Sequence, residues 1–250
     1  MSLENKIAIV AGGARDIGRA VSVSLAAQGA KVVVNYCNNA SDGEATVAAI
    51  KNAGGEAIAV RGDMTKQADV ENLVAEARKA FGDTIDVLVN VVGGLVARKT
   101  LSEMDVEWFE SVMRLNVSSA FLTCQAVVPH MTSGASIVNF ASQAGRDGGG
   151  PGASAYATSK GAVMTFTRGL AKELGPSNIR VNCVCPGMIS TTFHDTFTKD
   201  QVRANVAAGT PLRREGQASE VADLVTYLAS PASSFITGAS VDVNGGLLFS

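Results

Sequence analysis

Residues 7–18, Ile-Ala-Ile-Val-Ala-Gly-Gly-Ala-Arg-Asp-Ile-Gly, form the stretch of sequence that decides the fold. The apolar, β-branched run at 7–10 predicts a short buried strand, and the glycines after it predict a tight turn. A helical pattern over residues 16–28 follows directly. Because the first turn of a helix presents free amide groups and the positive end of the helix dipole, this unit is suited to hold a phosphate group.

The alternation of strand and helix continues along the whole chain. Short apolar runs at 31–35, 57–60, 85–90, 136–140, 180–184 and 240–243 predict six further buried strands. Helical patterns lie between them at 44–52, 67–81, 105–130, 155–174 and 220–229. This order predicts one α/β domain over residues 1–250, a doubly wound parallel sheet of about seven strands with helices on both faces. Two irregular segments, 145–152 and 190–211, are where we expect substrate loops.

Composition excludes several classes of protein. The chain is 46% hydrophobic and 18% charged with a formal net charge of −2, which gives no basic field to attract nucleic acid. Its four cysteines include no C-x-x-C pair, so we expect reduced core thiols and no metal site. The first apolar run is too short for a signal peptide, and no apolar run reaches about eighteen residues. We therefore expect a cytoplasmic protein that does not span a membrane.

Three further motifs accompany the glycine-rich turn. They are Asn90-Val91-Val92-Gly93 after the fourth strand, Ser142 with Tyr156-Ala157-Thr158-Ser159-Lys160, and Cys185-Pro186-Gly187 after the sixth strand. Together the four motifs resemble the short-chain dehydrogenase/reductase family, whose first turn is T-G-x-x-x-G-x-G, and the resemblance covers nearly the full length. It implies a Rossmann-type fold, a nicotinamide cofactor, reduction of a carbonyl group and a homo-oligomer, most simply a tetramer.

The resemblance also implies a set of cofactor-binding residues, with departures from the family pattern. Asp16 stands at the middle glycine of the turn and places a carboxylate near the expected phosphates, where it would cost binding energy unless Arg15 or a helix amide offsets it. Val91 replaces the second asparagine of the family's N-N-A-G. The expected set is Gly12, Arg15, Asp16, Ile17, Gly18, Tyr36, Asp63, Met64, Asn90, Gly93, Tyr156, Lys160, Pro186, Gly187, Ile189 and Thr191.

The choice between NAD and NADP depends on the end of the second strand. An acid there would bind the ribose 2′-hydroxyl and repel a 2′-phosphate, but this chain has Asn35-Tyr36-Cys37-Asn38. Arg15 lies where family members often place a base for the 2′-phosphate, and Asp16 beside it would neutralise that charge. Both cofactors stay open at this stage, with NADH favoured.

Tyr156 and Lys160 are four residues apart, and so share one face of a helix. A phenol has a pKa near ~10, and a lysine ammonium together with the positive nicotinamide would stabilise its phenolate. Ser142 closes the fifth strand, where its hydroxyl is suited to hold a carbonyl oxygen as charge develops. By resemblance, Asn116 orders a water in a proton relay to Lys160. The predicted catalytic set is Asn116, Ser142, Tyr156 and Lys160.

The substrate is less constrained. Segments 93–99, 148–152 and 192–194 resemble those of reductases that convert 4-deoxy-5-keto-uronates from alginate to 2-keto-3-deoxygluconate. Glycine-rich backbone can donate amide groups, and a cationic side chain can pair with a uronate carboxylate. The candidates are Arg98, Lys99, Gly149, Gly150 and His194, although exposed basic residues are commonly only solvated. The alternatives are a 3-oxoacyl-[acyl-carrier protein] or other ketone reductase, and an inert nucleotide-binding scaffold, which would be expected to lack a catalytic residue.

Overall fold

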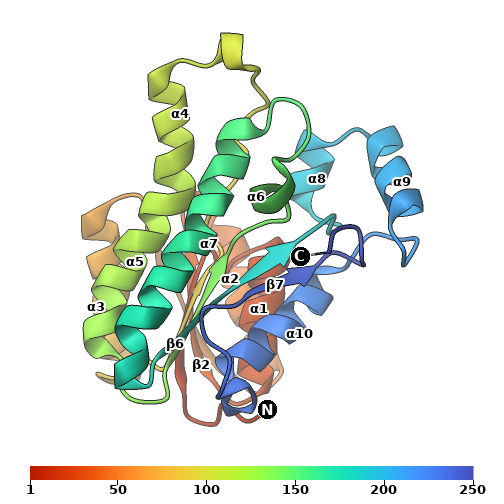
Figure 1. Ribbon diagram of the computed structural model, residues 1–250. Helices are drawn as coiled ribbons and strands as arrows, with labels where there is room; N and C mark the ends of the chain where they lie inside the picture. The colour runs from red at the N-terminus through yellow and green to blue at the C-terminus, as the bar shows by residue number, and fades with distance from the viewer. Residues whose placement is uncertain (250) are drawn as a thin grey trace.

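The computed structural model describes residues 1–249, and its centre is a seven-stranded parallel sheet (Figure 1). The strand order is β3-β2-β1-β4-β5-β6-β7, so the order reverses between β1 and β4. The strands are β1 (Ile7–Ala11), β2 (Lys31–Tyr36), β3 (Glu56–Arg61), β4 (Val87–Asn90), β5 (Ser136–Phe140), β6 (Arg180–Pro186) and β7 (Ser240–Val243). The predicted doubly wound Rossmann-type fold is confirmed. In such sheets ligands bind beside the carboxyl ends of the strands at the point of reversal.

Both faces of the sheet are buried because alternate residues of each strand point to opposite sides. In β1, Ala8 and Val10 pack in one apolar cluster and Ile9 packs in the other. In β4, Val89 belongs to the first cluster and Leu88 to the second. This double burial explains why the strands appear in the sequence as continuous apolar runs without a polar alternation.

Helices cover each face of the sheet in a separate layer (Figure 1). Apolar side chains of α1 (Asp16–Ala27), α2 (Ala40–Asn52) and α10 (Ala218–Ala229) pack on one face. Those of α3 (Gln67–Phe81), α5 (Ser119–Val127) and α7 (Ser154–Leu174) pack on the other. The single-turn 3₁₀ helices η1 (Leu101–Glu103), η3 (Val128–His130), η4 (Gly175–Ser177) and η5 (Pro231–Ser233) complete the connections.

The long helical pattern at 105–130 is interrupted in the structure. It contains α4 (Val106–Met113), a π-helical segment η2 (Arg114–Ser118), α5 and η3. A π-helical turn inserts an extra residue into the hydrogen-bonding ladder, and such turns are frequent at functional sites. Here the π-helical segment contains Asn116, one of the predicted catalytic residues.

The two irregular segments form short helices beside the carboxyl ends of the strands (Figure 1). The first contains α6 (Ala144–Asp147). The second, expected to be a loop, folds into α8 (Thr192–Phe197) and α9 (Asp200–Gly209). Over the part of the chain that the structure describes, no helix combines the length and hydropathy that crossing a bilayer requires.

Candidate active site

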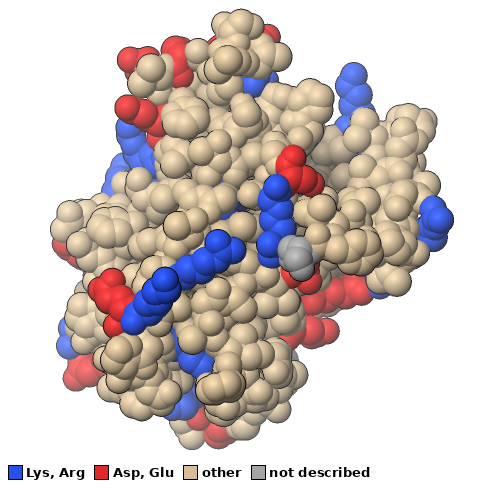
Figure 2. Space-filling model, in the orientation of Figure 1, with Lys and Arg blue, Asp and Glu red and all other residues tan. Residues whose placement is uncertain are grey.

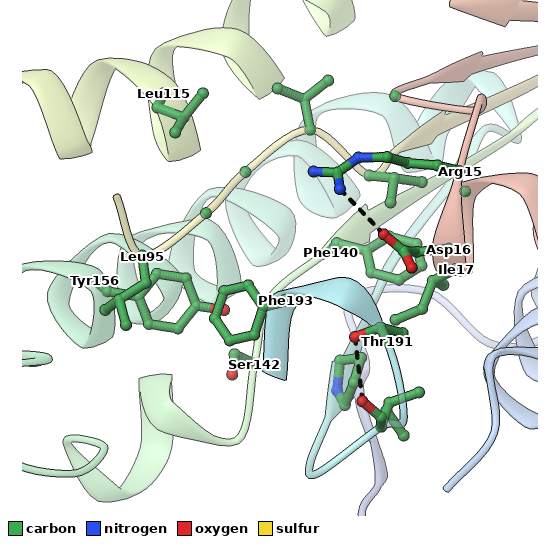
Figure 3. A pocket seen from close by; sticks show the side chains of 18 of the residues that line it. Arg15, Asp16, Ile17, Leu95, Leu115, Phe140, Ser142, Tyr156, Thr191 and Phe193 are labelled. Atoms are coloured by element: carbon green, nitrogen blue, oxygen red, sulfur yellow. Dashed lines mark hydrogen bonds and ion pairs between the residues drawn. The ribbon is translucent and has the colours of Figure 1, made fainter. Parts of the chain in front are cut away.

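A cleft of about 680 Å³ lies beside the carboxyl ends of the strands (Figure 3). It extends from the glycine-rich turn after β1 to Tyr156 on α7. The predicted residues that line it are Gly12, Arg15, Asp16, Ile17, Gly18, Tyr36, Gly93, Arg98, Ser142, Gly149, Gly150, Tyr156, Lys160, Pro186, Gly187, Ile189, Thr191 and His194. The predicted residues outside its lining are Asp63, Met64, Asn90, Lys99 and Asn116.

The glycine-rich turn is closely packed, and its glycines leave no room for a larger side chain. Gly12 N donates a hydrogen bond to Asn35 Oδ1 at 3.0 Å. A Cβ at Gly18 would lie 2.0 Å from the Gly12 carbonyl oxygen, so any larger residue would force the turn away from α1. The close packing leaves the first amides of α1 at the cleft, as a phosphate-binding turn requires.

Tyr156 and Lys160 lie next to each other on α7, as their spacing predicts. The Lys160 Nζ is 5.8 Å from the centre of the Tyr156 ring and donates to the Phe140 carbonyl oxygen at 2.8 Å. Burial lowers the pKa of Lys160 to about 8. Burial also raises the pKa of Tyr156, opposed by a hydrogen bond with Ser142. These protein groups together raise the pKa of Tyr156, whereas the sequence led us to expect that Lys160 and a bound nicotinamide would lower it.

Ser142 lies just after β5, at the mouth of the cleft opposite Tyr156 (Figure 3). Its Oγ accepts a hydrogen bond from Ala144 N at 3.2 Å, which fixes the side chain at the start of α6. Ser142 and Tyr156 thus provide two hydroxyl groups that converge on one position. Such a pair can bind a carbonyl oxygen and protonate it.

Asn116 supports the cleft from behind its lining. Its Oδ1 accepts from Gly94 N at 3.0 Å, and its Nδ2 donates to Gly94 O at 2.9 Å and to Val112 O at 3.0 Å. A Cβ at Gly93 would lie 2.5 Å from Asn116 Oδ1 and 2.8 Å from Lys160 Nζ. Asn116, Gly93 and Lys160 are therefore in close contact, and the proton relay through Asn116 stays a prediction.

Two predicted cofactor residues have side chains that serve the protein core. Asn90 is buried, donates to Asn139 Oδ1 at 2.9 Å and accepts from Thr123 Oγ1 at 2.7 Å. Met64 packs in the apolar cluster on the α3 side of the sheet. Their side chains do not reach the cleft because the polar and apolar partners in the core occupy them, so any cofactor contact must come from their backbone.

Asp63 is also engaged within the protein. Its Oδ1 accepts from the backbone and the hydroxyl of Thr65, at 3.0 and 2.7 Å. Burial raises its pKa, but these hydrogen bonds and Lys66 outweigh burial and hold the pKa below its usual value. The adenine contact implied by the family resemblance stays a prediction.

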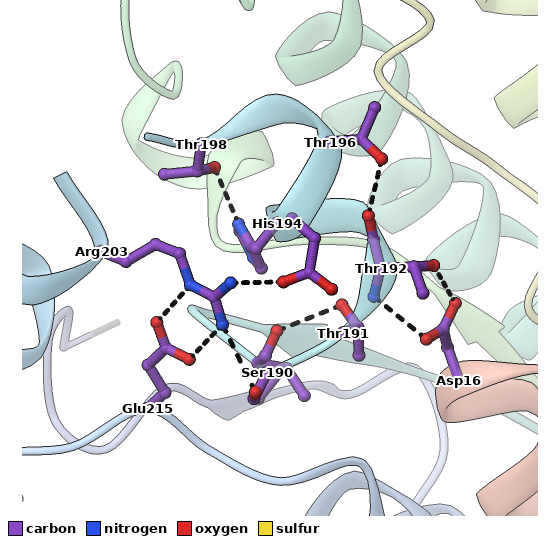
Figure 4. Close-up of polar contacts among 11 residues, drawn as sticks. Asp16, Ser190, Thr191, Thr192, His194, Thr196, Thr198, Arg203 and Glu215 are labelled. Atoms are coloured by element: carbon purple, nitrogen blue, oxygen red, sulfur yellow. Dashed lines mark hydrogen bonds and ion pairs between the residues drawn. The ribbon is translucent and has the colours of Figure 1, made fainter. Parts of the chain in front are cut away.

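The Asp16 carboxylate lines the cleft and is engaged with α8. It accepts hydrogen bonds from Thr192 at the start of α8 (Figure 4), and Arg15 pairs with it at 3.4 Å (Figure 3). Arg15 also donates to Thr192 Oγ1 at 2.7 Å. The physical reason is that the first amide of α8 and the Arg15 guanidinium provide the nearest positive partners for the carboxylate.

The predicted substrate cations are largely engaged elsewhere. Arg98 lines the cleft but donates to the carbonyl oxygens of Pro151 and Phe197 at 3.0 and 3.3 Å. Lys99 lies outside the lining, with its Nζ 5.0 Å from the centre of the Trp108 ring. Burial, followed by the nearby Arg203 guanidinium, lowers the pKa of His194. The neutral form of His194 is therefore favoured, which leaves Arg98 as the permanently charged member of this set at the cleft.

The structure adds cleft residues that sequence reasoning did not select. The ring centres of Phe193 and Tyr156 are 6.0 Å apart, and Leu95 and Leu115 line the same region (Figure 3). Asp42, in the first turn of α2, lines the opposite end near Tyr36. An aromatic residue in a polar segment after β6 was the available signal for Phe193. No sequence signal placed Asp42 at the cleft, because it lies in the first turn of α2 and not at the end of β2, where an acidic residue was sought.

Two features outside the cleft bear on function: the distribution of charge on the surface and the possibility of a metal site. Figure 2 shows basic and acidic side chains interspersed on one face, with uncharged surface between them. Among residues 1–249, no group of three or more His, Cys, Asp or Glu residues is arranged to hold a metal ion.

Comparison with known proteins agrees with the fold and the site. Residues 12–248 match the family model described as enoyl-(acyl carrier protein) reductase. A 3-oxoacyl-[acyl-carrier-protein] reductase of Synechocystis sp. is 38% identical over 251 residues, covering 99% of this chain and 98% of the relative.

Solved structures are similar over almost the whole chain. A short-chain dehydrogenase/reductase from Serratia marcescens is 33% identical with a TM-score of 0.93, covering 99% of each chain. An NADH-dependent reductase A1-R′ responsible for alginate metabolism is 32% identical with a TM-score of 0.90, again covering 99% of each chain. A blue fluorescent protein from a metagenomic library, in complex with NADPH, is 33% identical with a TM-score of 0.93 over both full chains.

The chain belongs to the short-chain dehydrogenase/reductase family. It is an oxidoreductase that acts on CH–OH and C=O groups with a nicotinamide cofactor.

Proposed function

We propose that Ser142, Tyr156 and Lys160 carry out the reduction of a ketone in this cleft. The observation that carries the proposal is the convergence of the Ser142 and Tyr156 hydroxyls beside the buried ammonium of Lys160. Tyr156 donates the proton to the carbonyl oxygen, and Ser142 donates a hydrogen bond to the same oxygen as negative charge develops. Lys160 stabilises the tyrosinate left behind.

The chain fits a dinucleotide at this position. The first amides of α1 face one end of the cleft, and the packing at Gly12, Gly18 and Gly93 keeps its floor free of side chains. When bound, the reduced nicotinamide supplies the hydride for the carbonyl carbon. Pro186, Gly187, Ile189 and Thr191 line the part of the cleft that would hold the nicotinamide end, and Lys160 lines the same cleft.

For the substrate, we infer a 4-deoxy-5-keto-uronate reduced to 2-keto-3-deoxygluconate. Arg98 at the cleft can pair with a carboxylate, and the backbone of Gly149 and Gly150 lies beside it. The similar NADH-dependent reductase responsible for alginate metabolism supports this substrate class.

A second candidate is a ketone on an apolar chain, such as a 3-oxoacyl thioester. Leu95, Leu115 and Phe193 give the region around Tyr156 an apolar wall, and the Synechocystis relative carries this activity in its name. Burial favours the neutral form of His194, and Lys99 lies outside the cleft lining beside Trp108. The cleft therefore offers an acidic substrate fewer cations than the sequence predicted.

For the cofactor, we infer NADH. Asp42 lines the cleft close to Tyr36 and Asn38, where the adenosine ribose of a dinucleotide lies in this fold. Its carboxylate would accept a hydrogen bond from a 2′-hydroxyl and repel a 2′-phosphate. Arg15, the expected partner of a 2′-phosphate, is bonded to Asp16 and Thr192 instead.

The test is to measure initial rates of NADH and NADPH oxidation with the keto-uronate and with a 3-oxoacyl thioester. We expect turnover of a ketone with NADH, with the uronate giving the higher kcat/KM. A higher kcat/KM with the thioester would replace the uronate by the second candidate. If neither ketone is reduced while NADH still binds, the proposed chemistry is wrong for both substrate classes.

Replacing Asp42 by Ala should shift cofactor preference toward NADPH. Removing a carboxylate near a phosphate that carries about two negative charges should lower the KM for NADPH by about fivefold to tenfold. Asp223→Ala on α10 is the control, since Asp223 is outside the cleft lining. An unchanged ratio of kcat/KM for NADPH and NADH in Asp42→Ala would remove Asp42 as the discriminating residue.

A further inference from the structure

Asp16 fastens the substrate-loop helix α8 to the cofactor-binding turn. Thr192 N donates to Asp16 Oδ1 at 3.1 Å, and Thr192 Oγ1 donates to Asp16 Oδ2 at 2.5 Å (Figure 4). Arg15 donates to the same threonine hydroxyl at 2.7 Å. The contacts join parts of the chain that are 176 positions apart. We call this set of Arg15, Asp16 and Thr192 the latch.

The latch supplies a cap that α8 does not provide for itself. The first amide groups of a helix have no partner within the helix, and a side chain before them commonly accepts their hydrogen bonds. Thr191 occupies that position but makes no capping bond, because its hydroxyl donates to Ile189 O at 3.1 Å. Asp16 satisfies the Thr192 amide instead, and its negative charge faces the positive end of the helix dipole.

The base of the latch is unusually well anchored. The Ser22 hydroxyl donates to Gly13 O at 3.0 Å, and the Thr46 hydroxyl donates to Ala14 O at 2.7 Å. Asp16 itself has φ of 50°, a conformation that favours glycine. A carboxylate is therefore retained at a position where the backbone alone would prefer no side chain. Residues held in such conformations cluster at functional sites.

Phe193 and His194 of α8 line the cleft. Phe193 follows Thr192 directly and contacts Tyr156, with 6.0 Å between ring centres. A second anchor holds the other end of this region: Arg203 bonds Asp195 at 2.5 Å and Glu215 at 2.7 Å (Figure 4). With both anchors made, α8 is fixed on two sides, by the latch and by Arg203, and Phe193 is held with it beside Tyr156.

We propose that Asp16 is a positioning residue for the ketone substrate. By capping α8 from the cofactor-binding turn, it holds Phe193 against Tyr156, so that the cofactor turn and the substrate wall move as one unit. The role differs from a cofactor contact, because it acts on ketone binding through α8. The inference rests on the proposed function, since Phe193 can affect a ketone only if the ketone binds at Tyr156.

The test compares Asp16→Gly, Asp16→Asn and Thr192→Val with wild type, and Thr196→Val serves as the control. Thr196 lies on α8, and its hydroxyl bonds only within the helix, to Thr192 O. The first readout is hydrogen–deuterium exchange of the amides of 192–197 in protein without ketone. The second is KM for the ketone, kcat, and the Kd for NADH.

Asp16→Gly should increase amide exchange in 192–197 and raise the KM for the ketone, each by about tenfold, the scale of one charge-assisted hydrogen bond. The Kd for NADH should not weaken, and the melting temperature should not fall, because glycine relieves the backbone conformation at residue 16. Asp16→Asn, which keeps one acceptor, should restore part of the loss. The double variant with Thr192→Val should be no worse than Asp16→Gly alone.

The outcomes separate this inference from the proposed function. Unchanged exchange in 192–197 together with an unchanged KM would overturn the role of Asp16 while leaving ketone reduction intact. A weaker Kd for NADH with an unchanged KM for the ketone would make Asp16 a cofactor residue and also overturn it. If exchange increases but wild type reduces no ketone, the proposed function fails, and the substrate role of Asp16 fails with it.

Discussion

The surroundings of Lys160 set the pH dependence that we expect for the proposed reaction. Burial lowers the pKa of its ammonium from the usual range to about 8, because the charged form loses its hydration. Its hydrogen bond to the Phe140 carbonyl oxygen holds Nζ beside Tyr156. In the proposed mechanism, Lys160 stabilises the tyrosinate only while Lys160 carries a proton.

The kcat/KM for ketone reduction should therefore fall as pH rises through about 8, since Lys160 loses its proton there. Lys160→Arg keeps a positive charge at all these pH values, so its lower activity should show no decline near pH 8. The measurement is a profile of kcat/KM from pH 6 to about 10 at saturating NADH. A wild-type profile that stays level past pH 9 would show that the charge of Lys160 is not required.

The sequence was sufficient to propose Ser142, Tyr156 and Lys160 as a set that meets at one cleft, whereas it did not predict side-chain directions. Spacing alone placed Tyr156 and Lys160 on one helical face, and the structure brings them to the cleft with Ser142. The direction of Asp16 depends on α8, which lies far along the chain, and the engagement of Asn90 depends on a neighbouring strand and helix. Such partners are tertiary, and no local pattern predicts them.

Among the elements, the loop after β4 packs closely against the π-helical segment. Asn116 bonds both backbone groups of Gly94, and Gly93 contacts Asn116 and Lys160. The π-helical turn was missed in the sequence because a single inserted residue hardly disturbs the apolar periodicity of a long helix. The seven strands were easier to predict, since burial on both faces makes each one a continuous apolar run.

Gly93→Ala should lower kcat strongly, and Gly94→Ala should not. The added methyl at position 93 would lie within 2.8 Å of Lys160 Nζ and displace the ammonium, whereas at position 94 it meets only Leu115, at 3.7 Å. We expect a loss of about a hundredfold for Gly93→Ala, the scale of one misplaced catalytic group. Steady-state rates of the two purified variants check this, and equal rates would show that the close packing has no catalytic weight.

On the scale of the whole molecule, Arg180 ties the sheet to the α10 layer. It lies in β6 and is buried, with Nη1 donating to Leu228 O at 2.8 Å and to Ser233 Oγ at 2.7 Å, and Nη2 donating to Ser230 O at 3.0 Å. Leu228 lies in the last turn of α10 and Ser230 follows the helix directly, where the helix dipole favours a positive charge. Burial lowers the pKa of Arg180 from its usual value.

Arg180→Met should lower the free energy of unfolding by about 2–4 kcal/mol, because the carbonyl groups at the end of α10 lose the charged Arg180 donors and keep only hydroxyl donors from Ser136 and Ser233. Arg168→Met on the exposed side of α7 is the matched control and should change it by less than about 0.5 kcal/mol. Urea unfolding of the three proteins measures the difference. Equal unfolding midpoints would contradict a structural role for Arg180. The tetramer implied by the family resemblance stays a prediction.

The most direct measurement of the central claim is kcat/KM for ketone reduction by Tyr156→Phe, with the Kd for NADH and the melting temperature as controls. Removing one hydroxyl should leave both controls within error, because Phe keeps the packing against Phe193. If Tyr156 is the proton donor, kcat/KM should fall by about a thousandfold, within the range of a lost general acid. A folded, NADH-binding Phe variant that keeps a substantial fraction of wild-type activity would contradict the account.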